Sequence, residues 1–187
     1  MKKYLYILIS AVLMTISVGC SKDEDDAQSS GTDNEVLGGI VWDYDTDQIT
    51  EGTDSVTAFF KRELHSPYWD GNRNEHKTFF EAGYSDSILV INSQKEFQKA
   101  YMGILELPYV DFNQYTLIIG RTWGNDGSYE LINVMLNDKG LNYELETKII
   151  HYVDRGAYDM INTFFYWRLY PKLSQKNIII HRTVIDV

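Results

Sequence analysis

The most regular pattern in the chain is an alternation of apolar and polar positions from Leu141 to Ile149. The alternate residues on one side of the pattern are Leu141, Tyr143, Leu145, Thr147 and Ile149. The residues between them are Asn142, Glu144, Glu146 and Lys148. Successive side chains of a β-strand point to opposite faces, so this period predicts a strand with one face in the core and the other in water.

Less regular apolar runs predict six further strands, at residues 39–43, 88–91, 115–123, 128–136, 164–170 and 177–187. Turns rich in Gly, Asn and Asp, at 124–127 and 137–140, separate the strands on either side of them. The last two strands have apolar residues on both faces, which favours central positions in a sheet.

Helical spacing appears first between Asp54 and Leu64, where Asp54 is a suitable N-cap. A strand is the alternative for this segment, because Val56, Ala58 and Phe60 also alternate. The pattern favours the helix.

A second helix is predicted to begin at Ser93, which forms a capping box with Glu96. Gly103 and Pro108 end the segment, and its apolar stripe is Phe97, Ala100, Tyr101 and Ile104. The elements together predict an α+β fold: a mostly antiparallel β-sheet or sandwich with one or two helices packed on it, in a single domain at 38–187.

Residues 1–19 have the pattern of an export signal, with a basic start at 1–3 and an apolar run at 4–18. This run is shorter than the roughly 20 residues that a membrane span needs. Ser17-Val18-Gly19-Cys20 resembles the bacterial lipobox, in which a cysteine is lipidated after cleavage, although leucine is usual where Ser17 stands. An ordinary signal peptide with an incidental cysteine is the alternative. Cys20 is the single cysteine of the chain, so no intramolecular disulfide can form.

An acidic run follows the cysteine directly: Ser21, Lys22, Asp23, Glu24, Asp25 and Asp26. The run resembles the export signal of Gram-negative surface lipoproteins, which implies a position on the outer face of the outer membrane. The stretch 20–37 is therefore predicted to be a lipidated cysteine with an acidic, flexible tether. A tether that is merely solvated is the alternative.

The charge balance narrows the range of partners. The chain has 17 Lys and Arg against 27 Asp and Glu, a net charge of −10. Cleavage before Cys20 removes Lys2 and Lys3 and no acidic residue, which gives 15 − 27 = −12. Such a balance argues against nucleic acid and anionic lipid as partners.

From Ile88 onward, several short sequence segments resemble the C-terminal domain of the PrcB family. The family is named for a non-catalytic subunit of a bacterial protease complex. The segments are Val90-Ile91-Asn92-Ser93 before a helix, and Val110-Asp111-Phe112 before the strand with Leu117-Ile118-Ile119. A Gly-rich turn and a strand at Tyr129 follow. The resemblance implies a binding or accessory role and offers no catalytic residues. Residues 37–87 have no counterpart, and 164–187 depart from the family.

An acidic segment resembles an EF-hand calcium loop, in which alternating carboxylates converge on one cation. Its possible ligands are Asp43, Asp45, Asp47, Glu51 and Asp54. Gln48 stands where the loop needs glycine, and Ile49 is one place early, so a solvated acidic loop is the preferred interpretation. No other cofactor is expected.

Two further groups of residues bear on function. Tyr68 and Trp69 precede an Asp-Gly turn and form a possible contact surface for a partner, although loop aromatics often fold back onto the core. His151 and His181 lie in predicted strands, where structural histidines are more common than catalytic ones. The sequence contains no Gly-x-Ser-x-Gly elbow.

These observations favour a non-catalytic binding or accessory module, anchored by lipid to the outer membrane and facing the cell exterior, with a protein or glycan partner. Two alternatives stay open. One is an extracellular hydrolase of glycans or peptides that uses Asp, Glu or His. The other is a structural subunit of an envelope complex.

Overall fold

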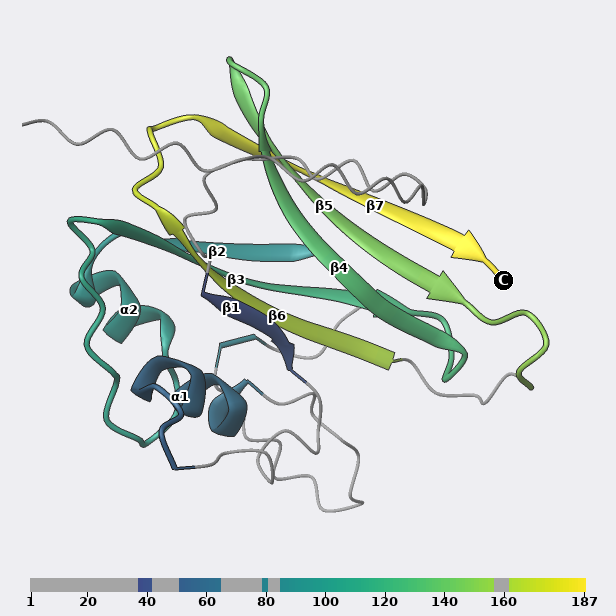
Figure 1. The fold of residues 1–187 in the computed structure, drawn as a ribbon, viewed down its shortest axis with the longest axis horizontal. Coiled ribbons are helices and arrows are strands. Elements are labelled where there is room, and N and C mark those ends of the chain that lie inside the picture. The colour runs from purple at the N-terminus through teal and green to yellow at the C-terminus, as the bar shows by residue number, and fades with distance from the viewer. Residues whose placement is uncertain (1–36, 42–50, 65–78, 81–84, 157–161) are drawn as a thin grey trace, which may run out of the picture. The chain divides into compact units, whose positions relative to one another are not determined.

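The computed structural model describes residues 37–41, 51–64, 79–80, 85–156 and 162–187. All of them belong to one compact unit, Asp33–Val187. They form two sheets and two helices, and the predicted α+β fold is confirmed (Figure 1). The elements are β1 (Gly38–Val41), α1 (Ser55–Glu63), β2 (Ser87–Ile91), α2 (Gln94–Ala100), β3 (Tyr115–Gly124), β4 (Tyr129–Asp138), β5 (Asn142–His151), β6 (Asn162–Pro171) and β7 (Asn177–Asp186).

The first sheet, sheet A, is antiparallel throughout and has the strand order β1-β6-β3-β2. Its two central strands are buried on both faces, because α1 and α2 cover one side and the second sheet covers the other (Figure 1). In β3, Leu117 and Ile119 face the helices, whereas Ile118 faces the second sheet. This double burial explains the continuous apolar run and confirms the predicted central position of β6.

The second sheet, sheet B, has the order β4-β5-β7, and β7 pairs with β5 in parallel. The predicted central position of 177–187 is therefore wrong, because β7 is an edge strand. Ile178 and Ile180 lie half-buried on its inward face, and Ile179 on its outward face is largely exposed. Apolar residues on both faces here reflect a partly open edge rather than double burial.

The two cores differ in composition. Half of the buried residues between sheet A and the helices are aromatic: Phe59, Phe60, Phe79, Phe97, Phe112, Phe165 and Trp167. The core between the sheets is mainly aliphatic and includes Ile118, Leu131, Val134, Leu145 and Ile149. The alternation predicted for β5 is confirmed, except that Leu141 lies in the preceding turn and is exposed.

Both helices begin where the sequence predicts. Asp54 caps α1, since its Oδ1 accepts from the backbone amides of Val56 at 3.0 Å and Thr57 at 2.9 Å, and the alternative strand is wrong. Ser93 caps α2 through the amide of Glu96 at 3.2 Å. Glu96 reaches one residue further back than a capping box requires, to the amide of Asn92 at 2.7 Å.

The predicted apolar stripe of α2 is wrong beyond Ala100. Tyr101 has an extended backbone, and its hydroxyl donates to Glu63 Oε2 at 2.6 Å and accepts from the amide of Leu105 at 3.0 Å. Burial and the Glu63 hydrogen bond raise the pKa of Tyr101 to about 12. This tertiary contact joins Tyr101 to the last residue of α1, so α2 ends at Ala100, and Ile104 is 96% exposed.

Candidate functional site

A groove lies where the chain crosses from sheet A to sheet B, at the connection 172–176 between β6 and β7. Its volume is about 330 Å³. The walls come from four elements and the connection, and include Val90, Asn92, Glu96, Tyr143, Lys172 and Ile178. Because β2 and β7 are both edge strands, the groove opens on the side of the sandwich where the two sheets end.

Hydrogen bonds hold the connection against sheet A. Lys172 Nζ donates to the backbone carbonyls of Phe112 at 2.8 Å and Asn92 at 3.3 Å. The Thr116 hydroxyl donates to Asn92 Oδ1 at 2.7 Å and accepts from the amide of Leu173 at 3.1 Å. These bonds fix the backbone on one wall of the groove, so the site is preformed.

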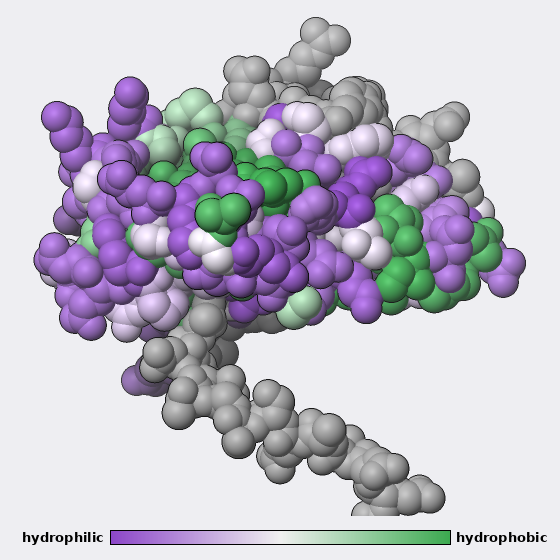
Figure 2. Space-filling view, turned by 90° about the horizontal axis from the view of Figure 1, so that it is seen from above, coloured by the Kyte–Doolittle hydropathy of each residue, from purple (hydrophilic) through white to green (hydrophobic). Residues whose placement is uncertain are grey.

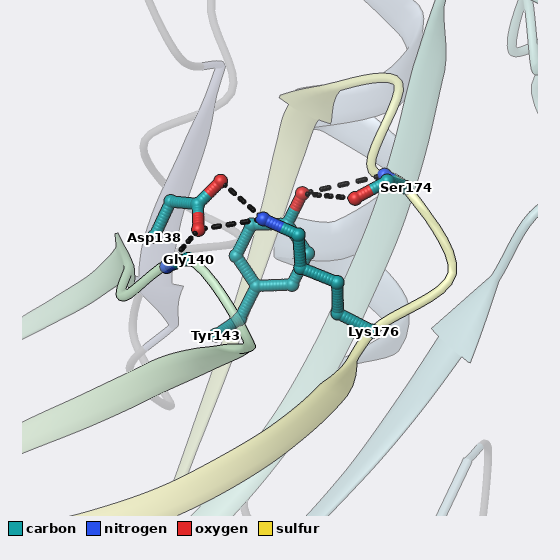
Figure 3. Close-up of polar contacts among 5 residues, drawn as sticks. All are labelled: Asp138, Gly140, Tyr143, Ser174 and Lys176. Atoms are coloured by element: carbon teal, nitrogen blue, oxygen red, sulfur yellow. Dashed lines mark hydrogen bonds and ion pairs between the residues drawn. The ribbon is translucent and has the colours of Figure 1, made fainter.

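Contacts with sheet B hold the second half of the connection (Figure 3). The Tyr143 hydroxyl lies 3.0 Å from Ser174 Oγ and accepts from the Ser174 amide at 3.3 Å. Lys176 Nζ donates to both carboxylate oxygens of Asp138, each at 2.7 Å, and lies 4.8 Å from the centre of the Tyr143 ring. The Gly140 amide donates to Asp138 Oδ1 at 2.8 Å, and Gly140 has φ +82°, which favours glycine.

Electrostatics at this end of the groove are balanced. The hydrogen bond from Lys176, followed by that from the Gly140 amide, lowers the pKa of Asp138 below its usual value. The lysine is thus paired with a carboxylate that stays ionised at neutral pH. Ser174 Oγ contacts the Tyr143 hydroxyl, which is not a base of the kind that activates a serine nucleophile.

The groove has a mixed lining, in which three aliphatic side chains lie among polar ones. Val90 of β2 is 40% exposed, and Leu173 and Ile178 are half-buried across from it. A groove that combines aliphatic side chains with polar groups held by hydrogen bonds suits a side chain of a bound partner. The arrangement favours binding over bond-breaking chemistry.

A second, polar pocket of about 330 Å³ lies on the outer face of sheet B. His181 Nε2 is 4.0 Å from Glu144 Oε1, and the Thr183 hydroxyl donates to Glu146 Oε1 at 3.2 Å. These side chains lie on one face because β5 and β7 pair in register, with Glu146 beside His181. Here carboxylates and an imidazole share one surface.

His151 forms a further contact between an imidazole and a carboxylate. Its Nδ1 lies 2.9 Å from Asp186 Oδ1, and its ring stacks on Tyr129 with centroids 4.4 Å apart. Ser128, which precedes Tyr129, is buried and donates its hydroxyl to Asp126, whose pKa is lowered by the hydrogen bonds from Ser128. Since Ser128 bonds to Asp126, it does not complete a Ser-His-Asp relay, and the His151–Asp186 contact ties the end of β5 to that of β7.

Most residues that the sequence suggested for function lie outside the described residues. They are Cys20, the run from Ser21 to Asp26, Asp43, Asp45, Asp47, Tyr68 and Trp69. Of the proposed calcium ligands, Glu51 is exposed and Asp54 already caps α1. No group of three or more His, Cys, Asp or Glu suited to a metal occurs in the described part of the chain, and calcium at the acidic loop stays a prediction.

The groove could not be predicted from the sequence, because its residues are distant along the chain. Asp138 and Lys176 are separated by 38 residues, and Asn92 and Lys172 by 80. The turn at 137–140 was recognised, but nothing in its sequence indicates that Asp138 has a cationic partner. The pairing depends on β7 returning beside β5.

No protein-family model matches the chain, and neither a curated protein nor a solved structure does. The resemblance to the PrcB family therefore stays a prediction. Within the described ranges, none of the helices has the length and apolar character to cross a membrane.

Proposed function

We propose that the chain is a lipoprotein anchored in the outer membrane through Cys20, and that its folded domain is a non-catalytic binding or accessory module at the cell exterior. The N-terminal pattern supports the anchor: a short apolar run ends at a small residue and the single cysteine. Two or more acyl chains give stable attachment, since each buried methylene contributes about 0.8 kcal/mol. The tether at 20–37 then holds the domain away from the bilayer.

Metabolic labelling with a fatty-acid analogue tests the anchor. Wild type should incorporate the label, and Cys20→Ala should lose it and be released from the membrane fraction. Ser17→Leu, which restores the usual lipobox residue, is the matched control and should be labelled at least as well as wild type. An unlabelled wild-type protein would contradict the anchor.

Exposure at the cell surface depends on the acidic run. Alanine at Asp23, Glu24, Asp25 and Asp26 should leave lipid labelling intact but protect the protein from protease added to whole cells. The same degree of cleavage in wild type and this variant would contradict the acidic run as an export signal.

The preformed groove between the two sheet edges is the single observation that carries the binding role. It combines half-exposed apolar residues with backbone and side-chain groups held by many hydrogen bonds. Figure 2 shows one face on which hydrophobic residues reach the surface in separate areas within a mostly hydrophilic surround. Exposed apolar areas with polar rims are typical of interaction sites.

Crosslinking on intact cells tests this role. A photo-reactive residue at Val90, in the groove, should give a discrete crosslinked product that a residue at Glu51, far along the chain and exposed, does not give. Equal products from both positions, or none from Val90, would contradict binding at the groove. A product with a stoichiometric envelope protein would instead identify a structural subunit.

A hydrolase of glycans or peptides is the second candidate function, and the polar pocket with Glu144, Glu146 and His181 favours it. An activity screen on extracellular polysaccharides and peptides should show turnover that is lost in Glu144→Gln or Glu146→Gln. Turnover of this kind would replace the proposed binding role.

A further inference from the structure

Edge strands carry unpaired backbone groups, and proteins protect them in recognisable ways. Three of the four sheet edges in the described part of the chain are short or irregular. β1 has four residues and β2 has five, and the register of β4 shifts between Leu131 and Asn133. β7 has ten residues in unbroken register with β5, and its sequence contains neither Pro nor Lys.

The hydrogen bonds at the end of β7 show which backbone groups face outward. The Val187 amide donates to the His151 carbonyl at 2.9 Å, and the Val187 carbonyl accepts from the Val153 amide at 3.1 Å. Val187 therefore points toward β5, and so do the other odd-numbered residues, because orientation alternates along a strand. The amides and carbonyls of Ile178, Ile180, Arg182 and Val184 point away from β5, to the free edge.

The same even-numbered residues direct their side chains into the sandwich. In the parallel register Ile178 lies beside Tyr143, and Ile180 lies beside Leu145, both of which are buried. Ile178 also lines the groove with Val90 of β2. A strand added to β7 would thus place alternate side chains in the gap between β7 and β2.

The ends of this gap are closed by polar contacts. Arg182 donates to the Trp123 carbonyl at 3.1 Å and stacks over the Trp123 ring at 4.5 Å. At the other end Lys176 is bound to Asp138. Val184 lies beyond Arg182 and is 40% exposed. The groove between the two sheet edges offers aliphatic side chains, Val90, Leu173 and Ile178, beside polar ones such as Asn92 and Glu96. The aliphatic side chains favour apolar residues of a segment that enters it.

We propose that the free edge of β7 binds an extended segment of another protein by β-strand addition, with apolar side chains at alternate positions entering the gap between β7 and β2. Main-chain hydrogen bonds provide affinity in this mode, and pockets for alternate side chains provide specificity. A second copy of the chain is disfavoured as the occupant, because each copy has a net charge of −10, or 15 − 27 = −12 after cleavage before Cys20. A basic or neutral segment complements that charge.

This inference rests on the proposed binding function and names its partner class. The probe is a synthetic nine-residue peptide of alternating Val and Thr with a Lys at each end, added to the full chain purified in detergent. Hydrogen exchange of individual β7 amides is the readout. In the free protein the amides of Ile178, Ile180 and Val184 should exchange fast, and those of Ile179, His181 and Thr183 slowly. The peptide should slow the first set.

Val184→Pro removes an outward amide without removing a bond to β5, because proline is tolerated at a free edge. It should weaken peptide binding about tenfold or more, whereas the matched control Val184→Thr, which retains the amide, should stay within about twofold of wild type. Val184→Lys, a charge on the free edge, should weaken binding as the proline does if the proline variant folds poorly.

Three results would overturn the inference. One is equal binding by Val184→Pro and Val184→Thr. Another is slow exchange of the even-numbered amides before peptide is added, which would mean that the edge is already covered. The third is a dimer of the free chain that Val184→Pro dissociates, which would make a second copy the occupant. If the crosslinked product at Val90 persists in Val184→Pro, the proposed binding function stands. In that case only binding by strand addition is rejected.

Discussion

Sheet A and sheet B bury their apolar residues in different ways. The central strands of sheet A are covered on both faces, by helices on one side and by sheet B on the other. Sheet B buries alternate residues of β5, while Glu144, Glu146 and Lys148 occupy the opposite face, and β7 has no fully buried residue. Sheet A is therefore covered on both faces, whereas sheet B has one face and one edge that no other described element covers.

The largest expected effect that tests this difference is in the aromatic core of sheet A. Phe60 is fully buried and stacks on Trp167 with ring centroids 4.4 Å apart. Phe60→Ala should lower the free energy of unfolding by about 3–5 kcal/mol, through lost transfer energy and the cavity left behind. Urea unfolding followed by tryptophan fluorescence measures it.

Ile104→Ala is the control, because Ile104 is almost fully exposed. It should change stability by no more than about 0.5 kcal/mol. If Ile104→Ala lowered the free energy of unfolding as much as Phe60→Ala, the segment around Ile104 would be buried in solution. That result would contradict the difference between the buried core of sheet A and the exposed segment.

The next largest effect on stability is expected at Gly120, a glycine of β3 that lies against Tyr166. Gly120 pairs with Tyr166, and a Cβ at Gly120 would lie 2.1 Å from Tyr166 Cζ. Gly120→Ala should destabilise the protein by about 1–3 kcal/mol, since the tyrosine ring must move within a packed core. Gly39→Ala is the matched control, because a Cβ there meets no atom within 4 Å. Thermal unfolding should separate the two variants.

A smaller effect is expected from the Tyr166 hydroxyl, which is buried and has no hydrogen-bond partner among the described residues. Burial raises the pKa of Tyr166 well above its usual value. Tyr166→Phe removes this unsatisfied group and should leave stability unchanged or raise it by up to about 1 kcal/mol. A clear loss of stability in denaturant unfolding would reveal a hydrogen bond that the structure does not contain.

The smallest effect is expected in sheet B, at the exposed pair of Asp138 and Lys176. The folded state lowers the pKa of Asp138, so its stabilisation is present above the usual value of about 3.9 and is lost as pH falls through the folded value. Asp138→Asn should be less stable than wild type near pH 6, and the two should converge near pH 2. Urea midpoints across this range measure the difference.

Lys176→Met provides the matched control, since it removes the same ion pair from the other side. Its pH dependence should resemble that of Asp138→Asn. If the difference in stability between Lys176→Met and wild type stayed constant down to pH 2, the lost stability would come from packing of Lys176 on Tyr143 rather than from charge.

Local features could be predicted from the sequence, whereas features set by distant contacts could not. The alternation in β5 and the caps of α1 and α2 depend on residues within one turn or one strand, and they were correctly predicted. The end of α2 depends on Tyr101 meeting Glu63, 38 residues earlier. The edge position of β7 depends on its parallel pairing with β5, and the groove follows from that pairing. Residues 177–187 have apolar side chains on both faces. This pattern is the same for a central strand and for an edge strand whose inner face is half-buried, so the sequence does not distinguish them.

Parallel pairing between β5 and β7 also has a consequence for biogenesis. Until β7 is in place, β5 is itself an edge strand of sheet B. A product truncated before residue 177 would expose the flank of its most regular strand. Such a fragment should associate with other chains through the exposed edge of β5, and it should be cleaved by protease faster than a chain that contains β7.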